Sequence, residues 1–260
     1  MQSKDESPEL LIDSNDGITT ITLNRPELRN ALTFDMYNGI AEFCQSPAEG
    51  TRAIVFRGAG ESAFAAGTDI KQFRDFDDPQ NFIDYESRID EVLDAIETCR
   101  VPTIAAVAGA CTGGGAMIAA VCDLRIACKD LKFGFPIART LGNTLSSRSL
   151  SRLAAIIGPA RTRDIIFTSR LIEIEEAENI GLISQVFENS ETLFLEARKL
   201  AESLLDRAPL TLYATKILQH RLLKGDLDDE DMVLMCYQSD DFKHGLESFL
   251  AKKKPQWQGK

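Results

Sequence analysis

The middle of the chain, residues 101–127, carries its strongest hydrophobic pattern. An apolar run at 103–108 is typical of a buried strand, three consecutive glycines follow at 113–115, and the apolar run at 116–121 fits a helix. A helix without a polar face does not lie on the surface of a globular protein. The pattern therefore predicts a strand, a glycine turn and a buried helix in close succession.

The glycines of this turn indicate what it could bind. Glycine has no Cβ, so a ligand can approach the backbone closely, and the first N–H groups of the next helix have no partner within the helix. Such donors suit an oxygen atom that gains negative charge. The same glycines would also let the helix pack closely on its neighbours. This stretch alone does not decide between the two interpretations.

Strands and helices alternate before this stretch. The hydrophobic pattern predicts a strand at 18–23, an amphipathic helix at 30–43 and a second strand at 52–57. Small residues at 58–70 form another turn after a strand, and a helical pattern follows Asp78. Such alternation predicts an α/β fold with a parallel or mixed sheet and crossover connections.

The last third of the chain is predicted to be helical, after a short strand at 131–133 and a strand-like segment at 181–187. The helical patterns cover residues 191–207, 209–223, 229–239 and 240–254. No internal repeat or low-complexity linker divides them from the rest. We therefore predict a core at 1–199 and a C-terminal helical region at 200–260 that packs on it as an appendage.

Charge narrows the possible partners. The 260 residues carry a formal net charge of -11, which argues against a general affinity for nucleic acid or for an anionic membrane. An anionic ligand would need a local basic pocket. The N-terminal residues are polar, and no run of about 18 uncharged apolar residues occurs, so neither a signal peptide nor a membrane span is expected.

The cysteines and histidines argue against disulfides and metals. The six cysteines include no C-x-x-C pair and lie mostly in apolar or helical patterns, which predicts buried free thiols and a cytoplasmic location. His220 and His244 do not stand at metal-ligand spacing from another histidine or a cysteine. We expect no metal, and we expect both histidines on a solvated face of the tail.

Several short motifs follow one another in a characteristic order. They are Ile21-Thr22-Leu23-Asn24-Arg25-Pro26 with Asn30-Ala31-Leu32, Ala63-Phe64-Ala65-Ala66-Gly67-Thr68-Asp69-Ile70-Lys71, residues 109–123, Gly134-Phe135-Pro136, residues 158–182, Ala208-Pro209 and residues 242–255. With this order and spacing the chain resembles the crotonase superfamily, the enoyl-CoA hydratase/isomerase family, along nearly its whole length. The resemblance implies a crotonase-like spiral of repeated ββα units with a C-terminal helical appendage, and an enzyme that processes acyl-CoA thioesters.

The resemblance also implies where the thioester lies. In the family two backbone N–H groups bind the thioester carbonyl oxygen, and these match Thr68 and Gly114 in this chain. Fixed donors in a dry pocket stabilise an enolate-type anion. The positions that match the family's contacts to coenzyme A are Leu28, Arg29, Ala66, Asp69 and Ile70. Lys71 and Lys253 could add positive charge for the phosphates, although lysines near a helix end are often simply solvated.

The departures from the family pattern concern the chemistry. Hydratases of the family carry one glutamate three residues after the middle glycine and another directly after the G-x-P turn, where this chain has Met117 and Ile137. Addition of water needs one group to take a proton and another to deliver one, and neither side chain can do so. Ordinary hydration is therefore not expected. The resemblance places both residues in the substrate pocket, together with Gly113, Pro136 and Thr140.

Other side chains could supply the missing acid/base group. Ser146 lies near a position where some branches of the superfamily carry an aspartate. A serine with no histidine or carboxylate beside it is a poor base, so the sequence favours hydrogen bonding to substrate or packing of the loop. Asp84, Tyr85 and Glu86 could face the pocket, but their polar surroundings favour a solvated helix face.

Three functions stay open on the sequence. The chain could be an acyl-CoA enzyme whose acid/base group lies elsewhere in the pocket, a conventional enoyl-CoA hydratase or isomerase with a relocated carboxylate, or a catalytically silent subunit that binds coenzyme A. No cofactor is expected beyond coenzyme A as part of the substrate. The resemblance further implies a homotrimer or homohexamer in which the helical tail covers a pocket.

Overall fold

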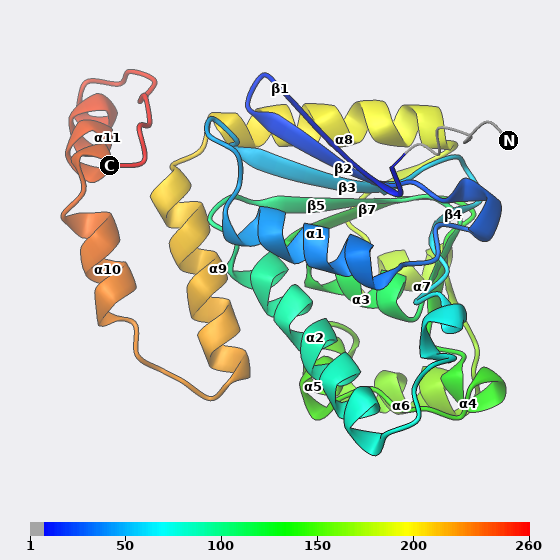
Figure 1. The fold of residues 1–260 in the computed structure, drawn as a ribbon. Helices are drawn as coiled ribbons and strands as arrows, with labels where there is room; N and C mark the ends of the chain where they lie inside the picture. Colours follow the sequence, from blue (N-terminus) through cyan, green and yellow to red (C-terminus); the bar gives the residue numbers. More distant parts are fainter. Residues whose placement is uncertain (1–7) are drawn as a thin grey trace, which may run out of the picture.

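The computed structural model of the protein describes residues 8–260. The larger of its two sheets has six strands in the order β1-β2-β3-β5-β7-β10 (Figure 1). Strand β1 pairs antiparallel with β2, and the other neighbours are parallel. The strands are Leu10–Asn15 (β1), Ile18–Leu23 (β2), Ala53–Gly58 (β3), Thr103–Val107 (β5), Leu124–Cys128 (β7) and Val186–Phe187 (β10).

A second, smaller sheet is built from the strands that follow β3, β5 and β7, together with β9 farther along the chain. Its order is β4-β6-β8-β9, and its strands are Ala63–Ala65 (β4), Ala110–Thr112 (β6), Lys132–Gly134 (β8) and Ile172–Glu173 (β9). Helix α2 (Pro79–Thr98) comes after β4, and helix α3 (Gly114–Val121) comes directly after β6. The units β3-β4-α2 and β5-β6-α3 thus repeat one ββα arrangement. The predicted α/β spiral of ββα units is confirmed.

Helices cover both faces of the larger sheet (Figure 1). Helix α8 (Ser190–Leu205) packs Ala197 and its neighbours against one face, which includes Val55 of β3. Helix α1 (Phe34–Gln45) and α3 pack on the other face, which includes Phe56. Successive residues of β3 therefore enter different cores, as is typical of a parallel strand between two helical layers. Helix α3 is buried along its length, as its hydrophobic pattern predicts.

Helix α1 begins later than the sequence pattern predicts. Arg29 and Asn30 have φ angles of 52° and 55°, in the left-handed region, so the helix cannot start there. It starts at Phe34, where the side chain of Thr33 caps it by accepting a hydrogen bond from the backbone N–H of Met36. The prediction of a helix from residue 30 is therefore wrong in its first turn.

The sequence pattern also misses strands β1, β4, β6 and β9. Strand β1 lies at the edge of the larger sheet, and all of its residues except Leu10 are exposed, so it has no buried face to produce an alternating pattern. Strand β6 has only three residues between the longer strand β5 and the glycine turn. Short and exposed strands give too few hydrophobic positions for a periodic signal.

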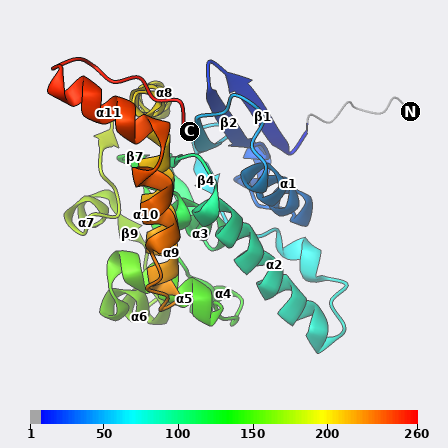
Figure 2. The same cartoon turned by 90° about the vertical axis from the view of Figure 1, so that its left-hand side faces the viewer.

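The C-terminal helices extend from one end of the sheet (Figures 1 and 2). Helix α9 (Pro209–Leu223) packs against α2, and α10 (Glu230–Tyr237) packs on α9, followed by α11 (Asp240–Leu250). Helix α8 runs across residue 200 and packs on the sheet as far as Ala201. The chain therefore leaves the sheet at the start of α9.

The remaining elements are the 3-10 turns Pro26–Leu28 (η1) and Ile70–Phe73 (η2) and the helices Ile137–Thr140 (α4), Ser147–Ile157 (α5), Pro159–Phe167 (α6) and Ile174–Asn179 (α7). Among them, helices α4, α5 and α6 form the lower part of the molecule in Figure 1. Within residues 8–260, no helix combines the length and the hydrophobicity that crossing a bilayer requires.

Candidate active site

Two glycine-containing turns, one after β4 and one after β6, touch each other. A Cβ atom on Gly67 would lie 3.7 Å from the backbone nitrogen of Gly114 and 3.4 Å from the carbonyl oxygen of Thr112. Gly67 has a φ of 106° and Gly113 a φ of 54°, conformations that L side chains rarely adopt. The two turns that the sequence singles out therefore form one contact, and glycine makes that contact possible.

The N–H groups of Thr68 and Gly114 have no hydrogen-bond acceptor among the residues that the structure describes. Their neighbours do: Asp69 N–H donates to the carbonyl of Leu32, and Gly113 N–H donates to the carbonyl of Gly134. A parallel bridge between Leu32 and Thr68 fixes the first turn against the segment before α1. Gly114 is the first residue of α3, where backbone donors lack intrahelical partners. The arrangement provides two fixed, available donors.

Asp69 and Arg25 hold the first turn in place. The Asp69 carboxylate accepts from the backbone N–H of Lys71 at 3.0 Å and pairs with the Arg25 guanidinium at 3.0 Å. Burial by itself would raise the pKa of Asp69, but the Lys71 N–H and the charge and hydrogen bond of Arg25 outweigh it and lower that pKa. Asp69 therefore stays ionised and acts as an anchor for this turn.

Three hydroxyl groups lie beside the two donors. The hydroxyl of Thr68 is 2.9 Å from that of Tyr37 on α1 and 2.7 Å from that of Tyr85 on α2. Burial raises the pKa of Tyr37 well above its ordinary value and that of Tyr85 to about 12, so both phenols keep their protons. Three hydroxyl protons serve two hydrogen bonds here. One O–H is thus left to donate to a further acceptor.

Tyr37 also explains why residue 114 is glycine. A Cβ atom at this position would lie 1.9 Å from the Tyr37 hydroxyl oxygen, far inside van der Waals contact. Tyr37 is fully buried and cannot move aside easily. The sequence pattern alone did not point to Tyr37, because it occupies an ordinary hydrophobic position of an amphipathic helix.

Met117 and Ile137 are both buried in the interior. Met117 lies on α3, one turn after Gly114, and Ile137 begins α4 directly after Pro136. Thr140 is exposed at the end of α4, and its hydroxyl donates to the carbonyl oxygen of Pro136. The two positions at which the resemblance predicts glutamate in a hydratase are therefore occupied by apolar side chains in the core.

The hydroxyl of Ser146 has a structural role at the start of α5. It accepts from the backbone N–H of Ser149 at 3.1 Å as the helix cap and donates to the Asp90 carboxylate at 3.1 Å. That carboxylate is in turn paired with Arg152. A catalytic role for Ser146 stays a prediction.

The structure brings together most of the positions predicted to contact coenzyme A. Ala66 N–H donates to the carbonyl oxygen of Arg29 at 3.0 Å, which joins the η1 turn to the segment after β4. Leu28 and Ile70 are exposed hydrophobic side chains on these two segments, with 41% and 58% of their surface accessible. Arg29 and Lys71 are exposed cations on the same two segments.

Lys253 is not near these segments within one chain. The segment after α11 lies at the opposite end of the molecule from β4 (Figure 1). Lys253 instead lines a hollow among Phe242, Phe249 and Trp257 of the tail. Within a single chain, Lys253 therefore does not lie on the same surface as the other positions predicted to contact coenzyme A.

The helix face at Asp84, Tyr85 and Glu86 differs from the solvated face that the sequence favours. Asp84 is exposed, but Tyr85 and Glu86 are partly buried. Phe73 packs edge-on against Tyr85 with ring centroids 4.8 Å apart, which holds the phenol ring toward Thr68. Because the sequence around these residues is polar, it does not indicate that this turn of α2 partly faces the interior.

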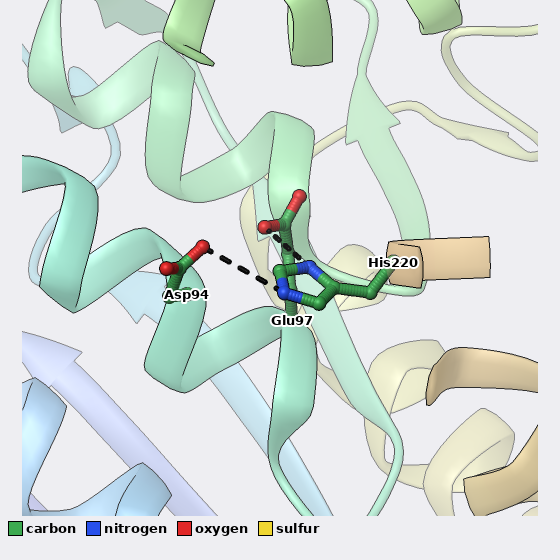
Figure 3. A group of neighbouring side chains, drawn as sticks. All are labelled: Asp94, Glu97 and His220. Carbon is green, nitrogen blue, oxygen red and sulfur yellow. Dashed lines mark hydrogen bonds and ion pairs between the residues drawn. The ribbon is translucent and has the colours of Figure 1, made fainter. Parts of the chain in front are cut away.

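A buried charge cluster lies farther along α2. Arg152 of α5 pairs with Asp90 at 2.8 Å, with Glu97 at 2.9 Å and with Asp94. His220 of α9 is also buried, 3.1 Å from Glu97, so the expectation of a solvated histidine is wrong. Asp94 and Glu97 lie on either side of the imidazole (Figure 3).

This cluster has the residue types of a metal site but already contains its cation. One ligand atom each from Asp94, Glu97 and His220 lies within 4.8 Å of the others. The Arg152 guanidinium binds the same two carboxylates and supplies the positive charge that a metal ion would bring. We interpret the cluster as a structural link between α2, α5 and α9.

Comparisons with known proteins identify a family whose sequences resemble this chain. The family model described as "Enoyl-CoA hydratase/isomerase" matches residues 13–260. The chain belongs to the enoyl-CoA hydratase/isomerase family. It is 30% identical to a short-chain-enoyl-CoA hydratase of Clostridium acetobutylicum, with 96% of this chain and 97% of that protein covered. It is 29% identical to a crotonyl-CoA hydratase of Syntrophomonas wolfei, with 94% and 96% covered.

Solved structures of the enoyl-CoA hydratase/isomerase family show the same fold. An enoyl-CoA hydratase/carnithine racemase from Magnetospirillum magneticum superposes with a TM-score of 0.88 at 30% identity, with 98% of this chain and 97% of that chain covered. A putative enoyl-CoA hydratase/isomerase family protein from Hyphomonas neptunium has a TM-score of 0.88 at 33% identity, with 97% and 98% covered. The resemblance stated from the motifs is confirmed, and the chain is an enzyme of this family.

Proposed function

We propose that the protein binds an acyl-CoA thioester with the carbonyl oxygen between the N–H groups of Thr68 and Gly114, and that it stabilises an enolate-type anion there. The contact between the two glycine turns carries the proposal, since it brings two donors without acceptors in residues 8–260 to one place. Removing one such donor costs about 3 to 4 kcal/mol of transition-state stabilisation in known oxyanion holes.

Coenzyme A would lie along the η1 turn and the segment after β4. The exposed Leu28 and Ile70 offer apolar contacts, and Arg29 and Lys71 offer local positive charge on a protein with a net charge of -11. Phosphate groups need such local cations because the field of the whole protein repels anions. The proposal includes no cofactor other than coenzyme A as part of the substrate.

The chemistry proposed here is proton transfer at carbon rather than ordinary hydration. Met117 and Ile137 can neither take a proton from water nor deliver one to the substrate. The oxyanion donors are backbone groups, so they do not depend on these side chains. An anion formed next to the thioester carbonyl would therefore still be stabilised, provided that another group moves the proton.

The test removes one donor and relieves the closest steric contact, which is with the Tyr37 hydroxyl. Gly114→Pro deletes the N–H at the first position of α3, where proline is tolerated, but its ring would meet the Tyr37 hydroxyl. The double variant Tyr37→Phe/Gly114→Pro makes that room. Relative to Tyr37→Phe alone, we expect deuterium exchange at the α-carbon of vinylacetyl-CoA to fall roughly a hundredfold. The measurement is proton NMR in heavy water.

Tyr37→Phe is the matched control for this experiment, because it shares the enlarged space and keeps the Gly114 N–H. Both proteins should have similar melting temperatures and circular dichroism. Equal exchange rates in the two variants would contradict the assignment of Gly114. If the unmodified protein did not bind vinylacetyl-CoA in calorimetry, the proposed function itself would be wrong.

We further propose that the protein assembles as a homotrimer or homohexamer. The tail exposes large apolar side chains, with 58% of Leu222, 42% of Leu234 and 81% of Phe249 accessible in the single chain. An assembly would cover them, and it could bring Lys253 of one copy toward the coenzyme A of another. Static light scattering at micromolar concentration should report three or six copies, and a monomer would contradict the proposal.

The proposed location is the cytoplasm. All six cysteines are free thiols, and five of them are buried. Free cysteines in this number are typical of proteins that work in a reducing compartment.

A further inference from the structure

The acidic residues of α2 differ in their partners. Asp90, Asp94 and Glu97 all bind the guanidinium of Arg152. Glu86, one turn before Asp90, is also partly buried, yet no lysine, arginine or histidine among residues 8–260 lies within 4.0 Å of it. A carboxylate that is partly removed from water without a cation is unfavourable for folding. The presence of Glu86 at this position therefore indicates a role other than stabilising the fold.

The surroundings of Glu86 favour its protonated form. Burial raises the pKa of Glu86, the charge of Asp90 adds to that effect, and a hydrogen bond from the backbone N–H of Ser146 partly opposes it. A carboxyl group with a pKa closer to neutrality exchanges protons with carbon acids more effectively than an ordinary surface glutamate. Perturbed carboxyl groups of this kind are frequent at functional sites.

Glu86 also lies on the turn of α2 that contacts Thr68 through Tyr85. It follows Tyr85, whose hydroxyl is 2.7 Å from that of Thr68, and its charge raises the pKa of both Tyr85 and Tyr37. Helix α2 packs against α3, which begins with Gly114. The Ser146 amide faces Glu86 from the end of the loop that starts after α4. The turn of α2 that carries Glu86 thus contacts both the Thr68 segment and the end of the loop before α5.

We propose that Glu86 is the acid/base residue of this site, in place of the carboxylates that Met117 and Ile137 replace. The inference rests on the proposed function. The Glu86 carboxylate takes a proton from the carbon next to the thioester carbonyl, and the C–H electron pair forms the enolate, whose oxygen lies between Thr68 and Gly114. The neutral Glu86 then returns the same proton to that carbon or, in an enoyl chain, to the γ-carbon. The second outcome moves the double bond and needs no co-reactant.

The test compares Glu86→Gln with the unmodified protein on vinylacetyl-CoA. Glutamine keeps the shape and can still accept from the Ser146 amide, but it cannot take a proton. We expect α-carbon deuterium exchange and conversion to crotonyl-CoA to fall at least about a hundredfold, while the affinity measured by calorimetry changes little. Asp84→Asn is the matched control, because Asp84 is exposed on the same helix and, among residues 8–260, its carboxylate accepts a hydrogen bond from Gln80 alone. It should leave both rates unchanged.

A second variant separates catalysis from folding. Glu86→Ala should lose exchange, and added formate or acetate should restore part of it, since a small carboxylate can enter the vacated space and take the proton. A residue with a purely structural role would not respond in this way. Failure of this rescue together with near-normal rates in Glu86→Gln would overturn the inference about Glu86.

The outcomes also distinguish Glu86 from the proposed function. An unmodified protein that binds vinylacetyl-CoA and exchanges its α-proton, with Glu86→Gln equally active, would contradict only the role of Glu86. Binding without any exchange in the unmodified protein would contradict the role of Glu86 and also the enolate chemistry of the proposed function, and would leave only thioester binding. Absence of binding would contradict the proposed function and the inference together.

Discussion

Crotonyl-CoA should be hydrated by this protein at least about a hundredfold more slowly than by a family member with glutamate at the positions of Met117 and Ile137, since one positioned acid/base group contributes roughly 10² to 10⁴ in rate. Hydration needs one carboxylate to activate water and a second group to protonate the α-carbon. Both side chains here are apolar and buried. The rate is followed by the loss of absorbance of the conjugated thioester.

Binding must be measured on the same samples, because slow hydration is informative only if crotonyl-CoA still binds. Calorimetry should therefore give an affinity for crotonyl-CoA similar to that of the family member with both glutamates. Restoring both carboxylates, as Met117→Glu/Ile137→Glu, should raise the rate only in part. Burial raises the pKa of a carboxyl group placed at these positions. The introduced carboxyl groups also strain the apolar packing around them. Hydration by the unmodified protein at the rate of a two-glutamate enzyme would contradict the prediction.

Replacing Arg152 by methionine should destabilise the protein by about 3 to 5 kcal/mol, the cost of removing one partner from a buried ionic cluster. Arg152 is 4% exposed and serves Asp90, Asp94 and Glu97. Burial alone would lower the pKa of Arg152, but these carboxylates outweigh it and raise that pKa, so the charged form is strongly held. Without it, three acids remain together on α2. Urea unfolding followed by circular dichroism measures the change.

Arg148→Met is the matched control. Arg148 lies on the same helix and also approaches Asp94, at 3.8 Å, but 64% of its side chain is exposed. Ion pairs of this kind contribute at most about 1 kcal/mol. A similarly small effect of Arg152→Met would show that the cluster does not hold α2 and α5 together. If only Arg148→Met lowered the stability, Arg148 rather than Arg152 would make the stabilising ion pair.

The hydrophobic pattern predicted the order of the main elements because buried strands and helices leave long periodic signals. It predicted α3 as a buried helix from seven apolar residues, and the structure places that helix in the core. The start of α1 was wrong because left-handed conformations at Arg29 and Asn30 leave no mark in a hydrophobic pattern. Strand β1 did have one local signal, the Asp16-Gly17 pair, which is typical of a hairpin turn.

The site could be predicted only as far as it depends on backbone turns. Glycine spacing and family motifs pointed to Thr68 and Gly114, and the structure brings their turns into contact. Tyr37 and Tyr85 come from two different helices, and their convergence on Thr68 depends on how α1 and α2 pack. His220 was placed on the wrong side of α9 because that helix has no clear hydrophobic face from which to orient it.

The contact between Tyr37 and Gly114 constrains the order in which this site can change over evolution. A side chain at residue 114 collides with the Tyr37 hydroxyl at 1.9 Å, so it is disfavoured as long as tyrosine occupies residue 37. Loss of that hydroxyl first, as phenylalanine, opens the space and makes the second substitution accessible. The reverse order passes through a misfolded or distorted intermediate. The two positions therefore form an epistatic pair, and a lineage that keeps Tyr37 also keeps the glycine that leaves the turn before α3 open.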